Sequence, residues 1–156
     1  MTITRKELGG FSSVACLKSM ITGIEDALGE KATAIALISA GRARGRQLAT
    51  RLNLTATNYD LETLTQKVAE ALGKDGTRLL LLHKVVCEGD LFKVYTSETV
   101  CSAGEPEGSP RLCTFTLGAV QGVLETVTGR RLRGIQIESV LRGGEFDVFE
   151  YGPVLR

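Results

Sequence analysis

The segment SAGRARGRQLATRLNL, residues 39–54, places two glycines, Gly41 and Gly45, inside a run that otherwise predicts a helix. Glycine in a helix interior costs about 1 kcal/mol relative to alanine, so a pair of them needs a structural reason. Residues four apart share one face of a helix, and glycines there let another backbone approach closely. A second pair with the same spacing, Gly118 and Gly122, lies in another predicted helix. The two pairs favour tight helix packing, and an apolar cavity beside them is the alternative.

Three arginines alternate through the same segment, at Arg42, Arg44 and Arg46. Alternate positions fan over more than half the circumference of a helix, so these side chains cannot all meet one ligand. We therefore expect them to lie in solvent. A second basic group, at residues 130–133, follows the end of a predicted helix. Cations are stabilised there by the helix dipole, and contact with anionic headgroups at a membrane surface is the alternative.

The hydrophobic pattern predicts an α+β fold. Apolar residues recur at steps of three and four in four stretches and predict helices over residues 12–28, 32–53, 60–72 and 111–127. Alternating and β-branched runs predict strands at 78–87, 91–97, 132–141 and 146–151, with turns at 88–90 and 142–145 and an exposed polar loop at 102–110. The order α-α-α-β-β-α-β-β suits two hairpins in a four-stranded antiparallel sheet that about four helices cover on one face. We expect residues 1–156 to form a single domain.

Composition excludes several classes of protein. A net charge of +1 argues against a nucleic-acid partner, which usually requires a strong basic excess. No run of 18 apolar residues predicts a membrane span, and the first residues lack the apolar core of a signal peptide, so we expect a cytoplasmic location. The four cysteines form no CxxC pair and predict free thiols, mostly buried, with no metal site: Cys16, Cys87, Cys101 and Cys113.

No catalytic residue is expected. Nucleophilic catalysis needs a nucleophile beside a base, and the single histidine, His83, falls in a predicted strand. No nucleophile-elbow, dinucleotide or phosphate-loop motif occurs in the sequence. An enzyme built on this chain would have to draw its polar groups from His83, Tyr95 and Glu138.

The second half of the chain resembles a known family. Three pieces carry the resemblance: Gly41-Arg-Ala-Arg-Gly45-Arg-Gln-Leu48, then Leu112-Cys113 with Gly118 five residues later, then Glu138-Ser139 followed by Gly143 and Asp147-Val-Phe149. Together they resemble the 4-vinyl reductase domain family, whose fold is shared with the Bet-type subunits of the TRAPP vesicle-tethering complex, over about residues 32–152. Ser139 and Asp147 stand where many relatives carry cysteines, which argues against metal or redox use of that pair. TRAPP relatives carry an acyl chain on a cysteine after the glycine helix, and no cysteine lies between Cys16 and Cys87 here.

The resemblance implies a non-enzymatic module that binds a hydrophobic or tetrapyrrole-like molecule, such as a lipid, without a covalent link. It also implies a homodimer, or a heterodimer with a paralogue, that assists the assembly of a larger complex. Relatives in photosynthetic bacteria are associated with chlorophyll synthesis and cyanobacterial ones with photosystem assembly. The chain is most similar to the cyanobacterial type, which would place it beside a membrane complex, peripheral to the membrane.

The large apolar residues of the two glycine-bearing helices are the candidates for the cavity wall. They are Ile38, Leu48, Leu52, Phe115 and Leu117, with Cys113 either packing at the helix start or touching the ligand. Two other functions stay open. One is a protein–protein scaffold with a filled core and an exposed apolar helix face used for dimerisation. The other is an enzyme of tetrapyrrole (chlorophyll) metabolism.

Overall fold

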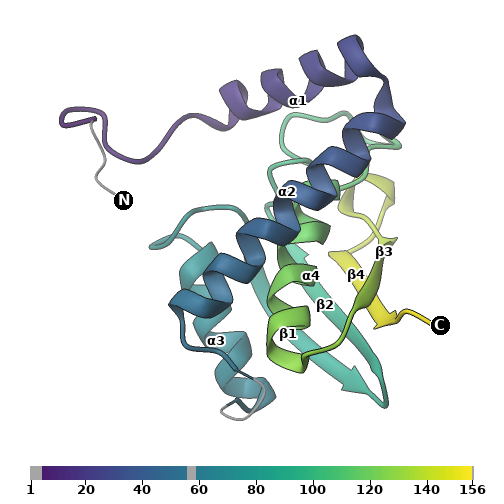
Figure 1. Cartoon of the computed structure of the whole chain (residues 1–156). Coiled ribbons are helices and arrows are strands. Elements are labelled where there is room, and N and C mark those ends of the chain that lie inside the picture. The colour runs from purple at the N-terminus through teal and green to yellow at the C-terminus, as the bar shows by residue number, and fades with distance from the viewer. Residues whose placement is uncertain (1–4, 56–58, 156) are drawn as a thin grey trace.

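A computed structural model describes residues 5–55 and 59–155, and this part of the chain forms four α-helices and a four-stranded sheet (Figure 1). The elements follow the order expected from the sequence, and the α+β class is confirmed. In chain order they are α1 (Val14–Leu28), α2 (Glu30–Arg51), α3 (Leu61–Leu72), β1 (Leu81–Glu88), β2 (Leu91–Ser97), α4 (Thr114–Thr128), β3 (Leu132–Glu138), the 3-10 helix η1 (Val140–Arg142) and β4 (Asp147–Pro153).

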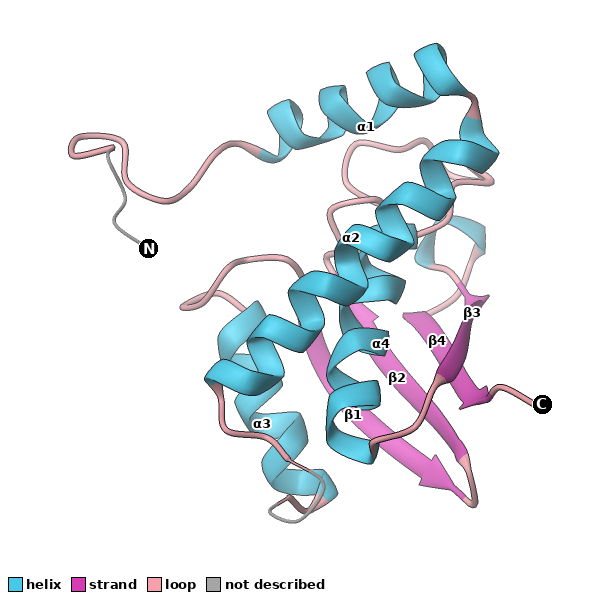
Figure 2. Ribbon diagram, in the orientation of Figure 1, coloured by secondary structure: helices cyan, strands magenta, loops and turns pink. Residues whose placement is uncertain are grey.

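Two antiparallel hairpins make the sheet. β1 pairs with β2 and β3 pairs with β4, and the hairpins join along β2 and β4, which gives the order β1-β2-β4-β3. Val94 lies opposite Phe149 at that central pair, and both side chains are buried. Figure 2 shows α3 and α4 across one face of the sheet and α2 across α4. The core therefore lies between the sheet and α4, with α2 as an outer layer.

Local sequence signals set the helix ends. Ser13 caps α1 by accepting a hydrogen bond from the backbone N–H of Cys16, and Asp60 caps α3 by accepting from that of Thr63. Gly29 ends α1 with a positive φ (85°, with ψ 155°) that a residue with a side chain rarely adopts, and α2 begins directly after it. This single glycine sets the direction in which α1 leaves the body of the protein.

Several element boundaries differ from those expected by up to three residues, among them the start of α4 and the end of β3. α4 begins at Thr114 rather than at residue 111, because the backbone before it is not helical. β3 ends at Glu138, since the Ser139 hydroxyl accepts a hydrogen bond from the backbone N–H of Leu141 and starts η1. In the described part of the chain, no helix is long and apolar enough to cross a membrane.

Candidate functional site

The two glycine pairs lie where the backbones of α2 and α4 touch. A methyl group at Gly45 would lie 2.9 Å from the carbonyl carbon of Ala119 and closer still to its oxygen. One at Gly118 would lie 2.9 Å from the carbonyl carbon of Ile38, and one at Gly122 would lie 2.9 Å from that of Arg42. Residues 38 and 118 thus face each other, as do 42 and 122, so the two helices run parallel. Protein backbone fills the space beside these glycines.

An apolar cavity of about 260 Å³ lies next to this crossing, at the N-terminal end of α4. We call it the α1 cavity, because α1 forms one whole side of it. Most of its wall residues are aliphatic or aromatic, and three charged residues and two threonines lie among them. They comprise Leu17, Lys18, Met20, Ile21, Ile24 and Glu25 of α1, Leu37 and Ala40 of α2, and Leu79, Val100, Cys101, Arg111, Leu112, Thr114, Phe115 and Thr116.

Helix α1 covers the cavity without being buried itself. None of its 15 residues is buried, and the large apolar side chains of Leu17, Met20 and Ile24 are 37 to 58% exposed. Figure 1 shows α1 joined to the start of α2 and running alone above the rest of the molecule. An isolated helix of this length is marginal in water, so the contacts that hold α1 decide whether the cavity has this wall.

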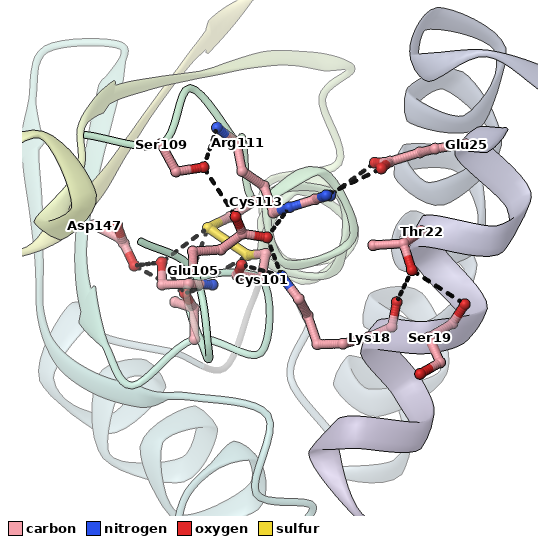
Figure 3. Close-up of polar contacts among 12 residues, drawn as sticks. Lys18, Ser19, Thr22, Glu25, Cys101, Glu105, Ser109, Arg111, Cys113 and Asp147 are labelled. Atoms are coloured by element: carbon pink, nitrogen blue, oxygen red, sulfur yellow. Dashed lines mark hydrogen bonds and ion pairs between the residues drawn. A yellow bond between two sulfur atoms is a disulfide. The ribbon is translucent and has the colours of Figure 1, made fainter. Parts of the chain in front are cut away.

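Four charged side chains hold α1 in place, and we call them the clamp: Lys18, Glu25, Glu105 and Arg111 (Figure 3). The Lys18 ammonium donates to Glu105 and, at 2.8 Å, to the backbone carbonyl of Cys101. The Arg111 guanidinium donates to both oxygens of Glu25, at 2.8 and 3.1 Å, and its Nε donates to Glu105. The clamp therefore joins two points on α1, one turn from each end, to the segment between β2 and α4.

The clamp keeps the Glu105 carboxylate ionised. The hydrogen bond from Lys18, followed by those from Ser109 and Arg111, outweighs burial and lowers the pKa of Glu105 to about 2. The carboxylate of Glu25 raises the pKa of Arg111, with a smaller effect of Glu105. At neutral pH the four groups carry two positive and two negative charges.

The segment that carries Glu105 and Arg111 is a loop, as expected from its sequence, but only part of it is exposed. Ser109 is buried, and a disulfide joins Cys101 to Cys113 at the two ends of the segment. The expectation of four free, mostly buried thiols is therefore correct only in part: Cys16 and Cys87 are free but exposed, and Cys101 and Cys113 are buried but bonded to each other. Prolines and polar residues indicated a loop, but sequence spacing could not show that the loop folds back under α1.

A buried carboxylate, Asp147, anchors the start of the same segment. Its Oδ2 accepts hydrogen bonds from the hydroxyls of Thr99 (2.8 Å) and Ser102 (2.9 Å), and its Oδ1 accepts from the backbone N–H of Val140 (3.1 Å). Ser139, the other position at which many relatives carry cysteine, caps η1. In the described residues no three His, Cys, Asp or Glu side chains are grouped as metal ligands. This pair of positions holds the fold together through hydrogen bonds.

One of the arginines expected in solvent is instead structural. The Arg42 guanidinium pairs with Glu125 of α4, with Nη2 2.9 Å from Oε2, and its side chain is only 25% exposed. Arg46, one turn later, is largely exposed, as expected. Burial alone would raise the pKa of Glu125, but hydrogen bonds from the Leu132 N–H, Arg42 and Gln121 outweigh it, so the pKa is lowered. Helical spacing predicts the side of the helix on which Arg42 lies. It does not predict that Arg42 pairs with Glu125, which is 83 positions away in the sequence.

The structure distributes the proposed wall residues between the cavity and the core. Phe115 lines the α1 cavity. Leu48, Leu117 and Cys113 are buried in the core, and two others are half-buried against it, Ile38 and Leu52. The cavity residues that sequence reasoning missed come chiefly from α1, where Lys18 and Glu25 lie seven residues apart on one helical face. That spacing, along one edge of the apolar stripe, marks a charged face of α1 but not the residues that it meets.

The three polar residues considered for an enzyme lie elsewhere, around the ring of Phe146. The His83 ring is tilted by 54° against that ring, with the centroids 5.0 Å apart, and its Nε2 shares a hydrogen bond of 2.7 Å with the Ser97 hydroxyl. Tyr95 meets the same ring edge-on, and Glu138 accepts from the backbone N–H of Phe146. None of the three is among the described residues that line the α1 cavity.

No protein-family model matches the chain, and no curated protein matches it in sequence. Solved structures match it in fold. The phenol-responsive sensory domain of the transcription activator PoxR, solved with phenol, gives a TM-score of 0.70 at 13% identity, over 91% of this chain and 75% of that one. A trafficking protein particle complex subunit 3 from Naegleria fowleri, covalently bound to palmitic acid, gives 0.59 at 14% identity, over 91% and 93%. A vinyl-4-reductase family protein from Methanocaldococcus jannaschii gives 0.57 at 15% identity, over 95% and 85%. The chain therefore has the fold of these 4-vinyl reductase and TRAPP-type proteins.

Proposed function

We propose that this chain is a non-enzymatic module that binds a small apolar molecule in the α1 cavity. The observation that carries the proposal is a cavity of about 260 Å³ with aliphatic and aromatic walls, closed on one side by a helix that has no buried residue of its own. A ligand there would complete the packing of α1. Small-molecule sites are typically concave and apolar with few polar groups, as this one is.

The polar groups of the cavity support binding rather than chemistry. Among the described residues, no buried side-chain nitrogen or oxygen lacks a hydrogen-bond partner. Catalysis would need a free acid, base or nucleophile directed at the ligand. The charged groups at the cavity, Lys18, Glu25 and Arg111, are instead engaged in the clamp.

The volume favours a compact ligand. A cavity of about 150 Å³ is enough to hold benzene, and pockets for drug-sized ligands start at about 300 Å³. A single aromatic ring or a short alkyl chain therefore suits 260 Å³. A tetrapyrrole, with four linked rings, would require α1 to move outward. Two proteins of the same fold were solved with an aromatic and an acyl ligand, phenol and palmitic acid, which agrees with these classes.

Exposed apolar side chains near the junction of α1 and α2 support the dimer and assembly role as a further part of the proposal. Met20 is 58% exposed, Leu28 66% and Ile35 65%. Exposed apolar patches often mark contacts between proteins. The partner would be a second copy or a paralogue. Sedimentation of the purified chain at several concentrations tests this part separately from ligand binding.

Toluene serves as an apolar probe to test the binding proposal. Its binding to the purified chain is measured by ligand-observed NMR. Ala40→Phe places a ring in the cavity and should weaken toluene binding at least tenfold. Ala43→Phe, one turn later on α2 and outside the cavity lining, is the matched control and should bind like the native chain. Absence of toluene binding to the native chain, or equal binding to the two variants, would refute the proposal.

A further inference from the structure

We infer that the α1 cavity takes uncharged ligands and excludes carboxylates, and that Glu25 and Glu105 set this selectivity. The inference rests on the proposed function, because it concerns which apolar molecules enter the same cavity. It adds a chemical restriction that the shape and hydrophobicity of the walls do not impose. Apolar walls alone would accept the hydrocarbon part of an acid and of an alcohol equally well.

Both cations at the cavity are already taken by carboxylates. Lys18 and Arg111 are the described basic residues in its lining, and an acidic ligand would have to pair with one of them. Arg111 gives both terminal nitrogens to Glu25 in a bidentate pair, and its Nε to Glu105. Lys18 donates to Glu105 and to the Cys101 carbonyl. The strongest donor directions are therefore used within the protein.

The charge balance opposes a third carboxylate. The clamp holds two cations and two anions, so an acidic ligand would bring its net charge to −1 at a site whose side chains are only 14 to 20% exposed. Weak access of water leaves that excess charge poorly screened. Protonation of Glu105 at neutral pH cannot remove the excess negative charge, because the pKa of Glu105 lies at about 2. The ligand would have to displace Glu25 or lose its own hydration without compensation.

The described residues of the neighbouring surface carry no net positive charge. A more polar hollow adjoins the cavity and shares Glu25, Arg111 and Leu112 with it. Its other charged residues are Glu30 and Lys31, again one of each sign. A head group that reached outward from the cavity would therefore meet a surface without net positive charge. An uncharged ligand meets none of these costs, because it leaves the clamp intact.

Removing one carboxylate should abolish the selectivity. Glu25→Gln leaves the volume of the side chain nearly unchanged, gives the clamp a net charge of +1 and weakens the hold on Arg111. Glu105→Gln does the same from the other side, where the acid pairs with both cations. Glu62→Gln, on the exposed surface of α3, changes the net charge of the chain equally but lies outside the clamp and is the matched control.

The experiment compares benzyl alcohol with benzoate, which are similar in size but differ in charge, by NMR titration of the full chain at pH 7. The native chain and Glu62→Gln should bind benzyl alcohol at least tenfold more tightly than benzoate. In Glu25→Gln and Glu105→Gln the benzoate affinity should rise at least tenfold, while that for benzyl alcohol changes less than threefold. Thermal unfolding of each variant, and its retained affinity for benzyl alcohol, show that the cavity is intact.

The outcomes separate this inference from the proposed function. If neither benzyl alcohol nor toluene binds the native chain, the proposed function fails and the inference fails with it. If benzyl alcohol and benzoate bind the native chain within threefold of each other, the cavity binds ligands but does not exclude carboxylates, and only the inference is overturned. Exclusion of benzoate that persists in both clamp variants would overturn the assignment to Glu25 and Glu105.

Discussion

Gly45→Ala tests whether the contact between α2 and α4 requires glycine. The added methyl group would lie 2.9 Å from both the Ala119 carbonyl carbon and the Val123 nitrogen, where ordinary contacts begin at 3.4 Å. Both neighbours are backbone atoms of a helix, so no side chain can rotate away and the helices must separate. A gap of about 0.5–1 Å forfeits a quarter to a half of the dispersion energy of the atoms involved. Overpacking of this kind costs about 3 kcal/mol.

Alanine also favours the helix over glycine by about 1 kcal/mol, so the expected net loss in the free energy of unfolding is about 2 kcal/mol. Urea unfolding followed by far-UV circular dichroism measures it. Gly23→Ala is the matched control, because Gly23 lies in α1 with nothing within 4 Å of the added methyl group. The urea concentration at the midpoint of unfolding of that variant should equal or exceed that of the native chain. A Gly45→Ala variant as stable as the native chain would refute the reasoning.

Three further predictions concern the charges and the disulfide. Glu125→Gln weakens the charged hydrogen bonds with Arg42 and should lower the free energy of unfolding by about 2 kcal/mol in urea, and an unchanged midpoint would contradict this. Because the folded pKa of Glu105 is lowered from 4.5 to about 2, the clamp stabilises α1 fully above pH 4.5 and loses this contribution as the pH falls toward 2. Hydrogen exchange of the α1 amides, corrected for its intrinsic pH dependence, should accelerate in that window, and acceleration between pH 7 and 5 would count against the clamp. Reducing the Cys101–Cys113 disulfide opens a loop with a separation of 12 residues and should lower the free energy of unfolding by about 3 kcal/mol. The measurement compares unfolding with and without reductant in a chain whose two exposed cysteines, Cys16 and Cys87, are replaced by serine. Equal free energies of unfolding would disprove the prediction.

Local pattern was sufficient to predict the architecture. In the second half of β4, alternation follows the two faces of the sheet, since Phe149 and Tyr151 are buried and Glu150 is less so. The step of three and four in α3 follows the side that packs on the core, where Leu64, Val68 and Leu72 are buried. These features depend on residues close together in sequence. The caps at Ser13 and Asp60 are of the same kind, and the structure has both.

The site could not be predicted in the same way because it is made of long-range pairs. Glu25 and Arg111 are 86 residues apart, and Lys18 and Glu105 are 87 apart. Both ion pairs depend on the direction of α1, which follows from the backbone conformation at Gly29 (φ 85°). Sequence reasoning identified the apolar stripe of α1 but assigned the cavity wall to the glycine-bearing helices, since nothing local indicated that α1 folds back over them.

The position of the cavity follows from where the two parallel helices begin relative to the glycine contacts. α2 begins at Glu30, eleven residues before Gly41, whereas α4 begins at Thr114, four residues before Gly118. The glycine contacts fix the two helices at the crossing, so about two turns of α2 extend past the start of α4 with no helix of the core to pack on. Leu37 and Ala40 follow this extension and lie beside the first turn of α4, and the space next to them is closed by α1 and by the disulfide-bonded segment. Close contact at the glycines and space for a ligand are therefore two consequences of one crossing, which leaves α1 as the wall that can move without opening the core.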